Sequence, residues 1–227
     1  MTNTVRQYAL DFPHRSAYGR EDFLIAPCNE AAVKWIDLWP DWPAPALVLY
    51  GEAASGKTHL SYVWQDRVDA LRLPVQDLIG ADFSRIFTKA KALIIEDVDQ
   101  LIGDIEIEKS LFHLYNMAKE EQGHILLTAH SVASSWDFKL PDLRSRLCAA
   151  PSVSIHAPDD MLLNAVLVKM FMDRQLEVSE DVLNYISSRI ERSFSYIRQL
   201  VERADKIALA EKKGITIPVI RRVLEQM

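Results

Sequence analysis

The sequence has little cysteine, no long apolar run and no excess of positive charge. Its two cysteines, Cys28 and Cys148, belong to no CxxC motif and no Cys/His cluster. Sulfur ligation of zinc is therefore excluded, and two buried free thiols are favoured over a disulfide. No segment reaches the roughly 18 apolar residues of a membrane-spanning helix, and the N-terminus lacks the apolar stretch of a secretory signal. We expect a cytoplasmic protein with no membrane partner.

The charge balance is acidic, with 26 Lys and Arg against 32 Asp and Glu, a net charge of −6. Proteins that bind nucleic acid through phosphate contacts carry the opposite sign, so direct sequence-specific DNA binding is not expected. Hydrophobic residues make up 49% and charged residues 26%, which is typical of a folded globular chain. The 227 residues suit one domain of about 150 residues and a smaller one.

Short uncharged strands alternate with helices in the first two thirds of the chain. The apolar runs predict strands at residues 46–50, 92–96, 124–129 and 152–156, with helices from 57 to about 71 and over 107–122. This order is typical of a parallel sheet covered by helices on both faces, an α/β fold. After Pro158 no strand pattern remains, and three or four helices are expected. We predict an arm over 1–12, an α/β domain over 13–157 and an all-α domain over 158–227.

The strongest motif is GEAASGKT, residues 51–58, which satisfies G-x-x-x-x-G-K-[ST] between an expected strand and an expected helix. The backbone N–H groups of such a loop face nucleotide phosphates, its lysine reaches the β- and γ-phosphates, and its threonine can ligate Mg²⁺. A chance glycine turn is the alternative. The expected ADP- or ATP-binding residues here are Gly51, Ser55, Gly56, Lys57, Thr58 and His59.

Polar side chains follow the next two expected strands. Glu96 and Asp97 end one of them, where a P-loop ATPase keeps an acid for the metal and an acid for the attacking water. Most such ATPases place Asp before Glu, so the reversed order here should preserve nucleotide binding better than hydrolysis. Thr128 and His130 end the other strand and are candidates for sensing the γ-phosphate, although a solvated loop histidine is equally compatible.

Two arginines are candidates for contacting phosphates. Arg146 lies in LPDLRSRL, residues 140–147, before an expected strand. It is either an arginine finger, which stabilises transition-state charge on a neighbouring subunit's nucleotide, or a surface arginine paired with Asp142. Arg198 lies off the apolar stripe of the third C-terminal helix, and either reaches the phosphates or belongs to a solvated helix face.

With GKTHL at 56–60, the acids at 96–97, LPDLRSRL and SYIRQL at 195–200, the chain resembles the AAA+ ATPases of the bacterial replication-initiator (DnaA/Hda) family over nearly its whole length. The resemblance implies an AAA+ P-loop domain followed by a helical lid. It makes Arg146 the arginine finger and Arg198 the sensor-2 arginine, and it places Phe23 and Leu24 near the adenine. Glu96 and His130 depart from the family, which usually has Asp at both positions.

The N-terminal arm contains Gln7-Tyr8-Ala9-Leu10-Asp11-Phe12, which resembles the Q-x-x-L-x-[LF] peptide that docks on the sliding clamp of the replicative polymerase. Gln7 would donate hydrogen bonds while Leu10 and Phe12 fill an apolar pocket; alternatively, these two apolar residues pack the arm against the core. Full initiators continue into a DNA-reading helix-turn-helix domain, whereas this sequence ends at Met227.

The resemblance implies a negative regulator of replication initiation. Bound to nucleotide and docked on the clamp, it would stimulate ATP hydrolysis by the initiator, and its own ATPase would be weak. An autonomous ATPase or helicase loader and a non-enzymatic adaptor between clamp and initiator are the rival readings, and a homo-oligomer stays open.

Overall fold

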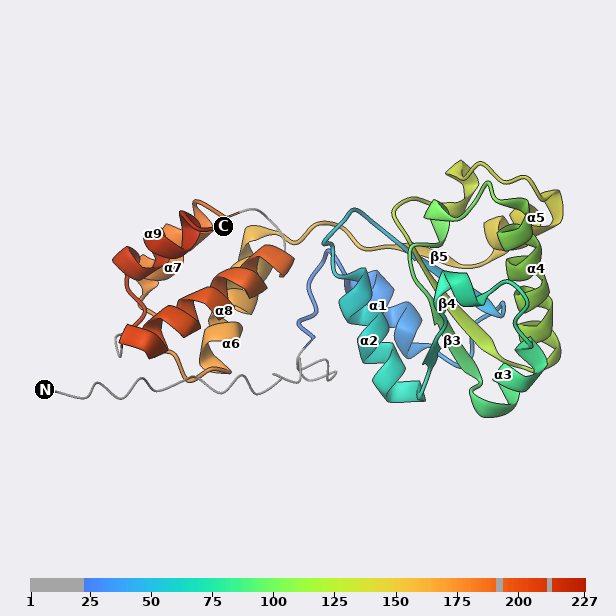
Figure 1. The fold of residues 1–227 in the computed structure, drawn as a ribbon, viewed down its shortest axis with the longest axis horizontal. Coiled ribbons are helices and arrows are strands. Elements are labelled where there is room, and N and C mark those ends of the chain that lie inside the picture. The colour runs from blue at the N-terminus through green and yellow to red at the C-terminus, as the bar shows by residue number, and fades with distance from the viewer. Residues whose placement is uncertain (1–22, 191–193, 212–213) are drawn as a thin grey trace, which may run out of the picture.

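The computed structural model describes residues 23–190, 194–211 and 214–227. An α/β part and a separate group of C-terminal helices lie side by side (Figure 1). The α/β part contains a sheet of five strands in the order β2-β3-β4-β1-β5, and every neighbouring pair is parallel. Its strands are β1 (Ala46–Tyr50), β2 (Leu71–Arg72), β3 (Ala92–Ile95), β4 (His124–Ala129) and β5 (Ser152–Ser154). The predicted parallel sheet is confirmed.

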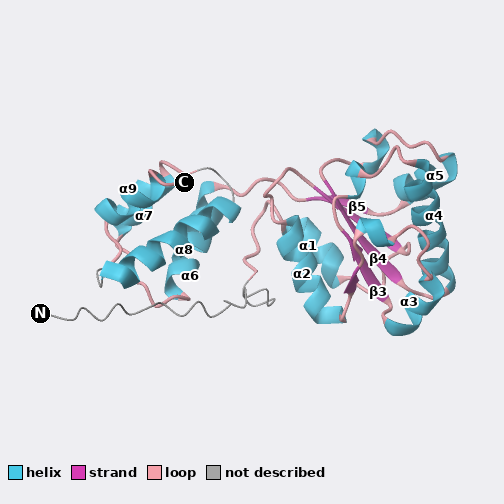
Figure 2. Cartoon of the chain, viewed as in Figure 1, coloured by secondary structure: helices cyan, strands magenta, loops and turns pink. Residues whose placement is uncertain are grey.

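Helices cover both faces of this sheet, as the uncharged strands require (Figure 2). One face packs against α1 (Glu30–Asp37) and α2 (Lys57–Val68). The other packs against α3 (Phe83–Lys89), α4 (Ile105–Glu120) and α5 (Pro141–Ala149). Each face has its own apolar core, because successive side chains of a strand point to opposite sides. In β1, for example, Leu47 and Leu49 belong to one core and Val48 to the other.

Within the described residues, four helices follow the sheet: α6 (Asp160–Met172), α7 (Glu180–Ser187), α8 (Phe194–Glu211) and α9 (Ile217–Leu224). They bury a third core of their own, in which Leu167, Ile186 and Leu200 are fully enclosed. The expected all-α C-terminal part is thus confirmed. The division at residues 12 and 157 stays a prediction.

Several features differ from the sequence-based expectation. The segment with Arg146, for which the sequence predicted no element, forms the helix α5. Both cysteines are free, but the prediction that they are buried is wrong: Cys28 is half-buried and Cys148 is exposed. Cys148 follows the buried Leu147 on α5 and so falls on the solvent side of that helix. No helix of the described segments is long and apolar enough to cross a membrane.

The strand register brings the motif-bearing loops together. Tyr50 of β1 lies opposite Ala129 of β4, and Ile95 of β3 lies opposite Leu127. Since parallel strands end at one edge of the sheet, the P-loop, the acids after β3 and the polar residues that end β4 share that edge.

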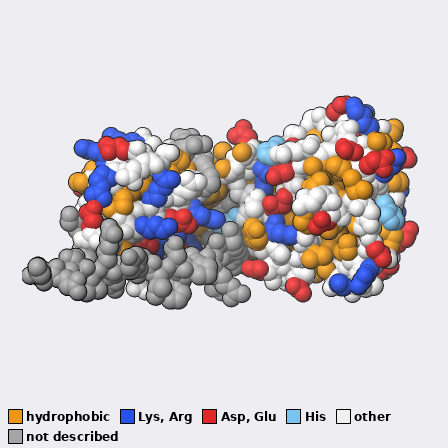
Figure 3. Space-filling view, in the orientation of Figure 1, with side chains coloured by type: hydrophobic (Ala, Val, Ile, Leu, Met, Phe, Trp, Pro, Cys, Tyr) orange, Lys and Arg blue, Asp and Glu red, His pale blue; other side chains and the backbone are white. Residues whose placement is uncertain are grey.

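On the face seen in Figure 3, basic and acidic side chains are interspersed over both parts of the molecule.

Candidate nucleotide site

The P-loop between β1 and α2 depends on its two glycines. A Cβ added to Gly51 would lie 2.1 Å from the Ile155 carbonyl oxygen, so no side chain fits there. Gly56 precedes α2 with φ of 108°, a left-handed conformation that favours glycine. The backbone N–H of Gly51 donates to the Ala129 carbonyl at 3.1 Å and joins the loop to β4. The loop therefore has the tight backbone that phosphate binding needs.

Lys57 lies within this loop and is only 6% exposed. Its Nζ donates to the carbonyl oxygens of Gly51 at 2.7 Å and Glu52 at 2.8 Å. Burial lowers the pKa of the ammonium, while the charges of Asp97, Asp99 and Glu96 act in the opposite direction. The lysine is thus held over the loop by two hydrogen bonds, and the nearby carboxylates favour its charged form.

Ser55 and Thr58 complete the loop's polar side chains. The Ser55 hydroxyl is buried, and no described residue is its hydrogen-bond partner. Buried hydroxyls are normally paired, so this donor fits a phosphate oxygen. Thr58 is exposed in the first turn of α2, where its hydroxyl is open to a hydrated cation. The residues of this loop fit a nucleotide phosphate.

One of the two expected adenine-side residues, Phe23, lies close to the same helix turn. Phe23 meets the His59 ring edge-on, with 5.2 Å between ring centroids. The buried Asn29 fixes the following segment, because its side chain accepts from Ala26 N–H and donates to the Leu24 carbonyl oxygen. Phe23 therefore lies beside the first turn of α2 and Asn29 fixes the Leu24 carbonyl, while the place of both residues near the adenine stays a prediction.

The two acids after β3 differ in their contacts. Glu96 Oε1 lies 2.8 Å from the Ser61 hydroxyl and 2.7 Å from Arg72 Nη1, both of which donate to it. Asp97 has a left-handed backbone with φ of 51°, its N–H donates to Thr128 Oγ1 at 3.0 Å, and its carboxylate is half exposed. Arg72 was not predicted as a site residue, because no motif connects it with Glu96.

His130 is held by carboxylates at the end of β4. Its backbone N–H donates to Asp99 Oδ2 at 2.9 Å, and its ring Nδ1 lies 3.4 Å from Asp99 Oδ1 and 3.9 Å from Asp97 Oδ1. The His130 side chain is nevertheless 38% exposed, so γ-phosphate sensing and a solvated loop histidine both stay predictions. Asp99 was missed, although an acid two residues after the expected pair was a signal that could have drawn attention to it.

The same edge can be compared with the needs of Mg²⁺. Thr58 and the half-exposed Asp97 offer the oxygen atoms that this ion prefers. Glu96 fits less well, because the Arg72 guanidinium already balances its charge. The described residues form no preformed cluster of three His, Cys, Asp or Glu side chains for a metal. A P-loop cation is mostly held by phosphates and water, so this absence is compatible with nucleotide binding.

Arg146 lies on the other face of the sheet, on α5. Its guanidinium carbon is 4.8 Å from the Phe112 ring centroid and 5.4 Å from that of Tyr115, both on α4. Arginine stacked on aromatic rings keeps its charge while its orientation is restricted. The arginine finger and the surface arginine paired with Asp142 both stay predictions for this residue.

The start of α5 is fixed by a buried carboxylate that the sequence did not point out. Glu108 of α4 is fully buried. It accepts from the backbone N–H groups of Gly103, Lys139 and Leu140 at distances from 2.6 to 3.0 Å. The Lys139 and Leu140 donors thus tie the loop before α5 to α4, and the Gly103 donor ties the turn just before α4 to the same carboxylate. The helix that carries Arg146 begins from a fixed point.

Helix α8 approaches the P-loop from the C-terminal part. A Cβ added to Gly56 would lie 3.4 Å from Cε2 of Phe194, the first residue of α8. Arg198 follows one turn later and is half-buried. The expected sensor-2 arginine therefore lies on the helix that begins at the P-loop. The candidate clamp-binding residues Gln7, Leu10 and Phe12 lie outside the described residues.

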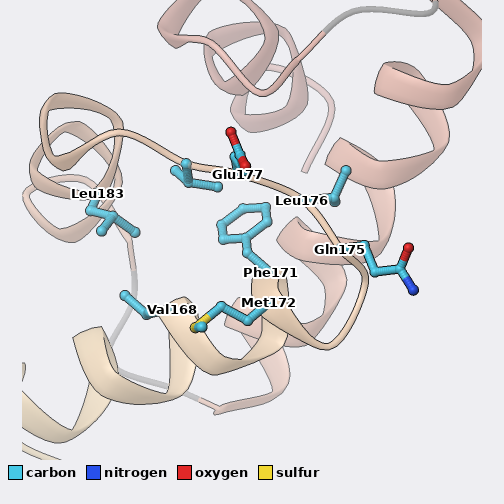
Figure 4. A pocket seen from close by; sticks show the side chains of 8 residues that line it. Val168, Phe171, Met172, Gln175, Leu176, Glu177 and Leu183 are labelled. Carbon is cyan, nitrogen blue, oxygen red and sulfur yellow. The ribbon is translucent and has the colours of Figure 1, made fainter.

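A hollow of about 480 Å³ lies among α6, α7 and the loop between them. Figure 4 shows Phe171, Val168 and Leu183 around it. Glu177 is the one charged side chain of its lining. An apolar hollow with a negative charge does not suit a phosphate, whereas the residues of the P-loop do.

Comparison with known proteins agrees with this geometry. The model of the bacterial DnaA ATPase domain matches residues 15–150, more than half of the chain, and the model of the Hda lid domain matches residues 160–224. The chain belongs to the Hda/DnaA family of AAA+ proteins. The predicted family and the AAA+ fold are thereby confirmed.

One curated relative is the chromosomal replication initiator protein DnaA of Cutibacterium acnes, which is 24% identical over 92% of this chain and 46% of its own length. The chain thus spans about half the length of that relative. Domain III of the Thermotoga maritima initiator DnaA has a similar fold, with a TM-score of 0.79 and 21% identity over 95% of this chain and 98% of that one. AMPPCP-bound DnaA from Aquifex aeolicus matches with a TM-score of 0.68 and 18% identity, over 85% and 65% of the two chains.

Proposed function

We propose that this chain is a nucleotide-bound regulator that switches off the replication initiator by completing the initiator's ATPase site. The observation that carries the proposal is a difference within its own nucleotide site, between the P-loop that would bind the phosphates and the acid that would face the metal. The P-loop is fully formed for binding, whereas the metal-side acid Glu96 is paired with Arg72. Such a site suits a chain that holds a nucleotide and turns it over slowly.

The nucleotide would serve as a structural element. ADP or ATP in the loop bridges the P-loop of the α/β part and the start of α8, which already meet at Gly56 and Phe194. A ligand can shift the position of the C-terminal helices only as far as it binds one arrangement better than another. Direct contacts from Arg198 to the phosphates would supply that difference.

Arg146 would then act on the nucleotide of the partner. Its guanidinium rests on Phe112 and Tyr115, and Glu108 fixes the start of its helix, so the charge is presented in a restricted direction. Facing the ATP of an initiator, it would stabilise the negative charge that develops on the transferred phosphoryl group. Arginine fingers supplied in trans accelerate related hydrolyses by about 10³ to 10⁵.

The arm would deliver the chain to its place of action. Gln7, Leu10 and Phe12 match the spacing of a clamp-docking peptide. An arm that binds the sliding clamp raises the local concentration of the regulator near newly replicated DNA without any DNA-binding surface of its own. The DNA polymerase clamp and the initiator are therefore the proposed partners.

The experiment follows the ATP bound to the initiator over time, with this chain, DNA-loaded clamp and Mg²⁺. The wild type is expected to convert initiator-ATP to initiator-ADP, and Arg146→Ala to lose about a hundredfold or more of that stimulation. Arg144→Ala is the matched control, since Arg144 is exposed on the same helix. Gln7→Ala should lose the stimulation that depends on DNA-loaded clamp, and should match the wild type when the clamp is left out.

Two outcomes would contradict the proposal in different ways. Full stimulation by Arg146→Ala would exclude the arginine finger and favour an adaptor that brings another factor. Rapid ATP turnover by the chain alone, without the initiator, would favour the autonomous ATPase or helicase loader.

A further inference from the structure

The structure surrounds one arginine with partners at the edge of the nucleotide site. Arg72, in the edge strand β2, donates from Nη1 to Glu96 Oε1 at 2.7 Å, from Nη2 to Ser61 Oγ at 2.9 Å and from Nε to Gln65 Oε1 at 2.7 Å. Its guanidinium carbon lies 3.7 Å from the Tyr62 ring centroid. All three kinds of guanidinium nitrogen and one face of the group are engaged. The charge of Arg72 is therefore held in one place.

This arrangement follows from the register of the sheet and from the length of Glu96. Arg72 lies opposite Ile94 in the parallel pairing of β2 with β3, so Glu96 is two residues further along the neighbouring strand. The side chain of glutamate is one methylene longer than that of aspartate and reaches the fully buried Ser61 on α2. The Ser61 hydroxyl also lies 2.9 Å from the carbonyl oxygen of Thr58, the P-loop residue expected to face Mg²⁺. The network therefore adjoins the first turn of α2.

We propose that Arg72 is a built-in counter-charge for Glu96 and makes ADP binding by this chain nearly independent of Mg²⁺. An arginine keeps its proton at all physiological pH values, so the neutralisation is permanent. A divalent cation that approaches Glu96 meets a carboxylate whose charge is already balanced, and only Asp97 attracts it fully. This inference rests on the proposed binding of nucleotide to the P-loop.

The test measures the affinity of the full chain for a fluorescent ADP analogue in Mg²⁺ buffer and in EDTA. For the wild type, the dissociation constants in the two buffers should differ by less than about threefold. In Arg72→Met the unpaired Glu96 attracts the cation, and the ratio should rise to about tenfold or more. In Glu96→Gln and in the double variant Arg72→Met/Glu96→Gln the ratio should stay at the wild-type value.

Arg67→Met is the matched control. Arg67 forms an arginine–carboxylate pair of the same kind with Asp37, at 2.8 Å, outside this network. Its removal should leave the ratio unchanged. Thermal melting of each variant checks that the fold is retained. The double variant separates a charge effect from a packing effect, since it keeps the Arg72 truncation and removes only the carboxylate.

The wild type alone can overturn the inference, whatever the stability of the variants. A loss of ADP affinity of about tenfold or more in EDTA would show that the wild-type site already depends on the cation. Such a result would leave the proposed function intact, because ADP would still bind. Absence of ADP binding in both buffers would instead contradict the nucleotide part of the proposed function, and this inference with it.

Discussion

The strand β4 begins and ends beside a histidine, and the two histidines have opposite surroundings. His124, at the amino end, meets the rings of Trp39 and Trp42 with centroid distances of 6.0 and 5.6 Å, and burial lowers its pKa. His130, just after the carboxyl end, faces Asp97 and Asp99. One end of the sheet is an aromatic core and the other a polar site. The same strand thus has an apolar, packed environment at one end and the candidate nucleotide site at the other.

The difference follows from how parallel strands join to helices. At the carboxyl ends, loops diverge into helices on both faces and leave polar backbone groups open to a ligand. At the amino ends, Trp42 stacks on Trp64 with 5.3 Å between centroids, and its Nε1 donates to the Trp35 carbonyl. Substitutions at the two ends should therefore separate ligand binding from stability.

The largest effect is expected at the polar end. Lys57→Ala removes the ammonium that would bind the β-phosphate of ADP, so ADP affinity should fall about a hundredfold. Titration with a fluorescent ADP analogue measures this loss. Lys34→Ala is the control, since Lys34 is exposed and pairs with Glu30 of its own helix. Equal affinity of Lys57→Ala and wild type would mean that the loop is not the nucleotide site.

At the aromatic end, the expected loss is in stability. Trp42→Ala empties a buried site that is 7% exposed and should lower the free energy of unfolding by about 4 kcal/mol. Urea denaturation measures this change. The folded fraction should bind ADP as the wild type does. A large loss of ADP affinity without a loss of stability would contradict the conclusion that the amino end of the sheet contributes to stability and not to nucleotide binding.

A buried carboxylate away from both ends sharpens the comparison. Glu108 is polar, yet its contacts are structural, because it accepts from two backbone N–H groups before α5 and from one before α4. Glu108→Ala leaves those donors buried and should cost about 3 kcal/mol of stability, measured in urea. The exposed Glu106→Ala, which loses a pair with Lys109, should change stability by less than about 0.5 kcal/mol. Similar values for the two variants would refute the structural role.

The smallest effect concerns pH. The pKa of His124 is lowered in the folded chain, so the unfolded chain takes up its proton first as the pH falls below the ordinary value near 6.5. This group therefore contributes stability above that pH and loses it on acidification. Thermal melts between about pH 7.5 and 5.5 should show a shallower decline for His124→Gln than for the wild type, by about 1 kcal/mol at most. A parallel decline would contradict the assignment.

Much of the fold was predictable because its strands are uncharged apolar runs that lie between segments with helical spacing of apolar residues. The P-loop was equally clear, since its pattern lies between β1 and α2. Strand β2 was missed because it consists of two residues, Leu71 and Arg72, which are too few to show the alternation of apolar and polar residues typical of a strand. The helical character of α5 was missed as well, because only Leu143 and Leu147 are buried in it.

The unpredicted side chains of the site act through long-range contacts. Arg72 reaches Glu96 across a strand pair whose register is fixed by the whole sheet. In the sequence Glu108 looks like any other acid of an amphipathic helix, and only the folded structure shows that the loop at Lys139 donates a hydrogen bond to it. Local patterns predict which groups belong to a site, but the charge that balances each group depends on the tertiary fold.

The central claim is that the ATP bound to the initiator is hydrolysed, while the nucleotide bound to this chain is not. The direct measurement loads the initiator with ATP carrying one radiolabel and this chain with ATP carrying another, then mixes them on DNA-loaded clamp with Mg²⁺. The account predicts that the initiator's label becomes ADP while the label on this chain stays ATP over the same interval. Conversion of this chain's ATP with the initiator's ATP unchanged would contradict it.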